Sequence, residues 1–202
     1  AVVILILLMV LSPHFGLAIL SFGTIWSYSV LPDAYTFQHY LQMFSSSTQL
    51  ISNTLLYAGL AATIDVVLGT VIAYLVWRTN LFGRKWLDFV AMGAVAIPGV
   101  VLGIGYLRTF HEFNVPIIDK PLASWWVIIV VALAIRRLPY ALRACVAAMQ
   151  QISIALEEAA ENLGANKRRT VFRIVVPLMS GGIVAGFITS FATASVELSA
   201  TL

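Results

Sequence analysis

One polar island interrupts the long apolar runs of this chain: Glu158-Ala159-Ala160-Glu161-Asn162-Leu163-Gly164, followed after nine further residues by Ile174-Val175-Val176-Pro177. Apolar residues recur at helical spacing before the glycine, which predicts a moderately amphipathic helix. Gly164 supplies the left-handed residue that ends such a helix. Asn166 can cap a second short helix over 167–176, and proline at 177 suits the first turn of the helix that follows. The stretch therefore predicts two helices joined by a tight corner.

The second of these helices would begin with three basic residues, Lys167, Arg168 and Arg169. A helix N-terminus already presents partial positive charge, so these residues should destabilise it locally. Compensation could come from lipid phosphates, from carboxylates on a partner, or from the acidic residues of the preceding helix, which are Glu157, Glu158 and Glu161. A solvated basic loop is the simpler alternative.

Composition places the chain in a lipid bilayer. Hydrophobic residues make up 60% of the sequence and charged residues 10%, and the mean hydropathy is +0.94. Soluble domains are far less apolar. The single Cys145 excludes a disulfide framework within the chain, and the three scattered histidines form no metal-ligand cluster. The basic pI of about 9.2 therefore indicates membrane topology rather than nucleic-acid binding.

Windows of about 20 apolar residues predict an all-α membrane protein with five spanning helices. These spans are 1–25, 50–77, 86–107, 121–142 and 178–202. No repeat of fixed period is found, so one membrane domain accounts for residues 1–202. Both ends of the sequence lie inside apolar runs, and we expect a piece of a longer chain, truncated at both ends.

The basic residues are distributed unequally between the two sides of these spans. If the polar island lies in the cytoplasm, ten basic residues fall on the inner side, which are Arg78, Arg84, Lys85, Arg136, Arg137, Arg143, Lys167, Arg168, Arg169 and Arg173. Two fall on the outer side, Arg108 and Lys120. This distribution obeys the positive-inside rule, which was not used to place the island.

The spacing E-A-A, three residues, G, nine residues, I, one residue, an aliphatic residue and P resembles the EAA loop of ABC importer permeases. Val176 stands where the family most often has leucine. The resemblance covers the chain from about residue 31 to 202. It implies a type I importer permease in which residues 157–177 form a cytoplasmic coupling loop that docks on the ATPase subunit. The coupling residues implied are Glu158, Ala159, Ala160, Gly164, Val171, Phe172, Val175 and Pro177.

The resemblance is greatest to permeases for ferric iron, with those for thiamine, polyamines or aminoethylphosphonate close behind. It implies a multi-pass protein of the bacterial inner membrane that works by alternating access. The implied partners are an ATPase homodimer that binds ATP and Mg, a solute-binding protein, membrane lipids and a second permease half, either an identical chain or a fused repeat. Nucleic acid is not among them.

No catalytic motif is found in the sequence, and no cofactor is expected in this chain. The phosphate-binding loop of an ATPase needs a Gly-Lys dipeptide, which does not occur. A zincin motif starting at His111-Glu112 would need histidine at position 115, where valine stands. ATP hydrolysis must therefore take place on another polypeptide.

Four residues are candidates for the translocation path: Asp65, Pro98, Gly99 and Glu197. An ionisable group in the middle of a span, such as Asp65, is costly unless it faces a cavity or a partner. A structural bond to a neighbouring helix is the equal alternative. Pro98 should kink the third span beside Gly99, and Glu197 lies in Val196-Glu197-Leu198-Ser199-Ala200, which resembles a segment common in permeases for ferric iron.

Two alternatives to an ABC permease stay open from the sequence. One is an ion-coupled secondary transporter that uses Asp65 and Glu197, and the other is a membrane scaffold without a path. A separate pattern predicts packing between helices or between the two halves of a dimer, rather than a binding site. Small residues recur every four positions in the last span, at Gly182, Gly186, Ser190 and Ala194.

Overall fold

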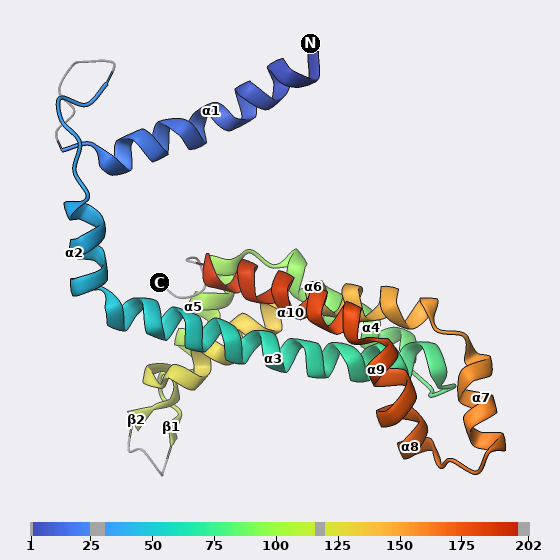
Figure 1. The fold of residues 1–202 in the computed structure, drawn as a ribbon. Coiled ribbons are helices and arrows are strands. Elements are labelled where there is room, and N and C mark those ends of the chain that lie inside the picture. The colour runs from blue at the N-terminus through green and yellow to red at the C-terminus, as the bar shows by residue number, and fades with distance from the viewer. Residues whose placement is uncertain (1, 25–30, 116–119, 198–202) are drawn as a thin grey trace. The chain divides into compact units, whose positions relative to one another are not determined.

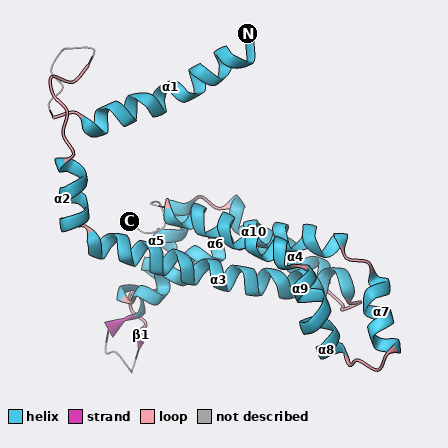
Figure 2. Ribbon diagram, in the orientation of Figure 1, coloured by secondary structure: helices cyan, strands magenta, loops and turns pink. Residues whose placement is uncertain are grey.

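The computed structural model describes residues 2–24, 31–115 and 120–197, and these residues form mainly helices joined by loops, with one short antiparallel strand pair (Figures 1 and 2). The chain divides into two compact units, residues 1–53 and 54–202. The two units are described separately below.

The first unit contains α1 (Val2–Phe22) and α2 (Gln38–Ser46). The Thr36 hydroxyl accepts a hydrogen bond from the Gln38 backbone N–H at 3.1 Å, just before α2. The corner between the two helices is held by the Tyr40 hydroxyl, which donates to Ser21 Oγ at 2.7 Å, and by an edge contact between the Phe22 and Phe37 rings.

The second unit is built around three long helices. Their bounds are Thr48–Arg78 for α3, whose first residues belong to the first unit, Trp126–Gln151 for α6 and Ser180–Ser195 for α10. Shorter elements connect them: α4 (Arg84–Gly93), η1 (Ala94–Ala96), α5 (Gly99–Phe110), β1 (Asn114–Val115), β2 (Lys120–Pro121), η2 (Leu122–Ser124), α7 (Ile154–Asn162), α8 (Lys167–Thr170), η3 (Val171–Val175) and α9 (Val176–Leu178). In the strand pair, Asn114 lies opposite Pro121.

Small residues let the three long helices pack closely. A Cβ atom added to Gly182 would lie 2.4 Å from Ala148 Cβ, and one added to Gly186 would lie 3.2 Å from the Ala141 Cα. Ser190 and Ala194 are buried in the same stripe of α10. The predicted role of this stripe in helix packing is confirmed, and its partner is mainly α6 of the same chain.

Two of the expected spans appear as unbroken apolar helices, α1 and α3, both long enough to cross a membrane. The third expected span is broken: residues 84–96 and α5 meet at 101°. In the last one, 178–202, the described part is mainly α10, and a bend of 64° separates α10 from the preceding helical segment 167–178. Counting each bent pair as one span gives at most four by length and composition, so the five-span count stays a prediction.

The expected span 121–142 is displaced along the chain. Helix α6 begins at Trp126 and continues to Gln151, and Arg136 and Arg137 lie in its interior, as they do in the expected span. Both guanidinium groups pair with Glu197, which removes much of the cost of placing them inside the helix bundle.

Candidate functional site

The polar island folds as an elbow, the name used here for residues 154–178. Helix α7 ends before Gly164, which has φ of +86°, and the Ala165 N–H donates back to the Ala160 carbonyl at 3.0 Å. Helix α8 begins at Asn166, whose Oδ1 accepts from the Arg169 N–H at 2.9 Å. The glycine corner and the asparagine cap are both as the sequence predicts.

The second arm of the elbow runs through α8, η3 and α9 as one continuous helix, with a π turn at η3. Proline at 177 cannot donate the usual backbone hydrogen bond to the preceding turn. The wider π turn lies immediately upstream of this proline, and we attribute it to the missing donor. The arm ends where the chain bends into α10 at Met179.

The elbow exposes some of the predicted coupling residues and buries others. Phe172 is 66% exposed, whereas Val175 is 1% exposed and packs in the core with Leu142, Cys145 and Met149. Glu158, Ala159, Gly164 and Pro177 are exposed, Ala160 is buried and Val171 is half-buried. Val175 therefore faces its own bundle, because its position in the helix places it against α6.

Leu163 is an exposed apolar residue that the sequence analysis used only as part of a helical pattern. It is 90% exposed at the tip of the elbow. Its position directly before the glycine corner could have indicated this, because a residue at a helix end has few neighbours. Together with Phe172, it gives the elbow two exposed apolar side chains.

A basic hollow of about 360 Å³ lies on the second arm of the elbow. It is lined by Asn166, Arg168, Arg169, Phe172 and Arg173. Among the residues that the structure describes, Lys167, Arg168 and Arg169 form no salt bridge. The predicted compensation by Glu157 is not found, because that carboxylate pairs with Arg78 at the end of α3 at 2.5 Å.

Asp65 is fully buried and accepts a hydrogen bond from the Ser190 hydroxyl at 2.5 Å. This bond joins α3 to α10 across the small-residue stripe. The other carboxylate oxygen has no hydrogen-bond partner within the described part of the chain. Of the two sequence alternatives, the geometry favours the structural bond between helices.

Glu197 joins two arginines of α6. Its Oε2 accepts from Arg136 Nε at 2.8 Å and also from Arg137, and its side chain is 4% exposed. Arg136 also donates to the Ile97 carbonyl at 3.3 Å. Ile97 is the residue before Pro98, so this ion cluster lies directly against the break in the third span.

The break itself follows from Pro98 and Gly99. Pro98 has an extended ψ of 138° and caps α5, and Gly99 is buried at the first position of that helix. The predicted kink is therefore present and much sharper than a bend within one helix. Residues 198–202, which complete the sequence segment around Glu197, lie outside the described residues.

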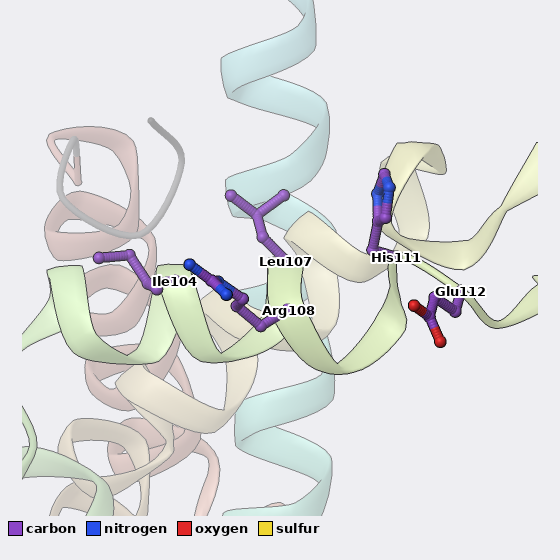
Figure 3. Close-up of a pocket in the computed structure, with 5 residues that line it drawn as sticks. All are labelled: Ile104, Leu107, Arg108, His111 and Glu112. Atoms are coloured by element: carbon purple, nitrogen blue, oxygen red, sulfur yellow. The ribbon is translucent and has the colours of Figure 1, made fainter.

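Figure 3 shows a second hollow, of about 560 Å³, along α5 and its C-terminal end. Its lining comes from this one segment: Ile104, Leu107, Arg108, His111 and Glu112. His111 and Glu112 point in different directions in this view. The described residues contain no group of three or more side chains that could hold a metal ion, so we assign no chemistry to this hollow.

Comparison with known proteins identifies the family. The profile of the family described as "Binding-protein-dependent transport system inner membrane component" matches residues 65–202, more than half of the chain. The ferric transport system permease protein FbpB of Actinobacillus pleuropneumoniae is 34% identical over 148 residues, which are 73% of this chain and 21% of that protein. A second protein of this kind, the putative FbpB 1 of Haemophilus influenzae, is 34% identical over 74% of this chain and 23% of its own length.

A third relative is covered more completely. The molybdenum transport system permease protein ModB of Escherichia coli is 30% identical over 162 residues, which are 76% of this chain and 70% of that protein. The chain thus spans about a fifth of the length of the ferric permeases and most of the molybdenum permease. These matches favour the permease reading over the ion-coupled transporter. By its family profile and by these relatives, the chain belongs to the binding-protein-dependent inner-membrane components, the permeases of ABC importers.

Proposed function

We propose that the chain forms part of the translocation path of an ATP-driven importer and that its elbow couples the path to a separate ATPase subunit. The family is described as an inner-membrane component of a transport system, and we expect the energy for transport to come from a separate ATPase. ATP and Mg would be bound by that partner, which we expect to be a homodimer. The single observation that carries the proposal is the shape and surface of the elbow.

Three features of the elbow support docking of a protein partner. Leu163 and Phe172 are exposed apolar side chains on its two arms. The basic hollow lies beside Phe172 and has no carboxylate from the described residues paired with Lys167, Arg168 or Arg169. A partner surface with an apolar groove and an acidic rim would complement both.

The position of the elbow also suits this role. Figure 1 shows α7 and α8 at the end of the second unit where α3 ends, and the Arg78–Glu157 ion pair joins these elements. This is the end that the distribution of basic residues assigns to the cytoplasm. A solute-binding protein would then deliver cargo at the opposite end, and a second permease half, identical or fused, would complete the path.

We propose ferric iron as the first cargo to test. The ferric permeases share 34% identity with this chain, whereas the molybdenum permease shares 30%. The experiment is uptake into proteoliposomes that contain the complete importer with its binding protein and ATPase, with ferric iron, molybdate and sulfate offered separately. ATP-dependent uptake of one of these supports the proposal. Uptake that depends on a proton or sodium gradient and not on ATP would overturn it.

The first prediction concerns the glycine corner. Gly164→Arg should abolish ATP-dependent uptake and weaken binding of the ATPase subunit, because a bulky charged side chain would stand at the proposed docking surface. Gly83→Arg is a matched control: Gly83 also has positive φ, +83°, and an added Cβ meets nothing within 4 Å at either position. Both variants therefore carry a similar backbone strain of about 1 kcal/mol. Co-purification and uptake measure the difference, and equal behaviour of the two variants would contradict docking at the corner.

A further inference from the structure

Arg78 is the last residue of α3, and its guanidinium group connects three elements of the second unit. Its Nε donates to Glu157 Oε1 on α7 at 2.5 Å. Its Nη2 donates to the carbonyl of Ile152, between α6 and α7, at 2.5 Å, and to that of Met149 near the end of α6 at 3.4 Å. We call this arrangement the Arg78 clamp.

The clamp is largely removed from solvent. The side chains of Arg78 and Glu157 are 10% and 11% exposed. Removing one partner of such a pair leaves the other as an uncompensated buried charge. The planar guanidinium group also provides several donors in a fixed arrangement, which the single ammonium group of lysine does not. The clamp therefore has a defined geometry that a conservative substitution disturbs.

Helix α7 has little other attachment to the bundle through buried side chains. Its buried residues are Glu157 and Ala160. Alanine offers a small apolar contact, so the ionic contact at Glu157 is the more specific of the two. The neighbouring Glu158 and Ala159 are exposed on the opposite side of the helix. One face of α7 is thus held by α3, and the other is the face proposed to meet the ATPase.

We propose that Arg78 is a positioning residue that passes movement of the elbow to α3 through Glu157. This inference rests on the proposed function of the elbow. When the ATPase moves the exposed face of α7, the rigid ion pair on its buried face would carry the end of α3 along. Helix α3 also contains Asp65, which is hydrogen-bonded to Ser190 of α10. A movement of α3 would therefore also displace α10.

The test uses the complete importer in proteoliposomes and measures ATP hydrolysis and ferric iron uptake in parallel. In Arg78→Lys and Glu157→Gln, the amount of iron transported per ATP hydrolysed should fall by about tenfold, because coupling energies of this kind are of that order. ATP hydrolysis and binding of the ATPase should stay close to those of the unmodified importer. The matched control is Arg143→Lys, which alters the exposed pair between Arg143 and Asp88, 3.5 Å apart.

Each outcome either supports or contradicts the proposed role of Arg78. A fall in the transport ratio for both clamp variants but not for the control supports the inference. A proportional loss of hydrolysis and transport, or a loss of ATPase binding, would assign Arg78 a merely structural role and overturn it, as would an unchanged ratio. If the unmodified importer shows no ATP-dependent uptake of iron, molybdate or sulfate, the proposed function itself has failed, which is a distinct result.

Discussion

Single side chains hold the helices of this protein together at a few buried polar contacts. Asp65 depends on one serine, Ser190, for its hydrogen bond. An aspartate inside an apolar bundle is expensive unless it has such a partner. The contact therefore predicts that stability is more sensitive to the serine than its small size suggests.

Replacing Ser190 by alanine should lower the free energy of unfolding by about 1–3 kcal/mol, because the buried Asp65 carboxylate loses its donor. Thr189→Ala is the control, since the Thr189 hydroxyl is bonded to the carbonyl of Ala185 in its own helix at 2.8 Å and the residue is exposed. That change should stay within about 0.5 kcal/mol. Denaturation in detergent measures both. Equal effects would show that Asp65 does not need this bond.

At the scale of elements, the decisive feature is the close contact of α10 with α6. Two adjacent glycines of α10 differ sharply in their surroundings. Gly182 lies against Ala148 and Ala144, whereas an added Cβ at Gly181 meets nothing within 4 Å. The same substitution at these two positions therefore distinguishes the effect of close packing on stability from the effect of helix propensity.

We predict that Gly182→Ala destabilises the protein by about 1–3 kcal/mol, because the added methyl group would force the helices apart. Gly181→Ala should be neutral or stabilising by up to about 1 kcal/mol, because alanine is the better helix former. Thermal unfolding of the two purified variants compares them directly. A loss of stability in both would indicate that the glycines serve backbone flexibility and not the approach of α6.

At the scale of the second unit, the cluster of Arg136, Arg137 and Glu197 connects α6, the break before Pro98 and the end of α10. Arg137 Nε has no hydrogen-bond partner within the described residues. The Glu197 carboxylate is therefore important for compensating the buried positive charge of Arg137. We propose that the cluster fixes the break of the third span.

Glu197→Gln should lower the free energy of unfolding by about 3–5 kcal/mol, since two guanidinium groups lose the charge of this buried carboxylate. Asp88→Asn, in the exposed pair with Arg143, should cost about 0–1 kcal/mol. Chemical denaturation of the detergent-purified variants measures the difference. Near-equal stabilities would show that other groups neutralise the two arginines.

The sequence alone predicted the elbow corner at Gly164, the Asn166 cap, the small-residue stripe and the kink at Pro98. Each of these depends on backbone preferences or spacing within a few residues, which the sequence displays directly. The functional roles of the elbow residues stay predictions. The family resemblance noted from the same stretch was confirmed by comparison with known permeases.

Only the tertiary structure decided which charges meet and which predicted residues are exposed or buried. Arg78 and Glu157 lie 79 positions apart, Arg137 and Glu197 lie 60 apart, and Asp65 and Ser190 lie 125 apart. No local pattern encodes such pairs, because they form only when distant helices pack. The same packing turned Val175 into the core and left Phe172 exposed.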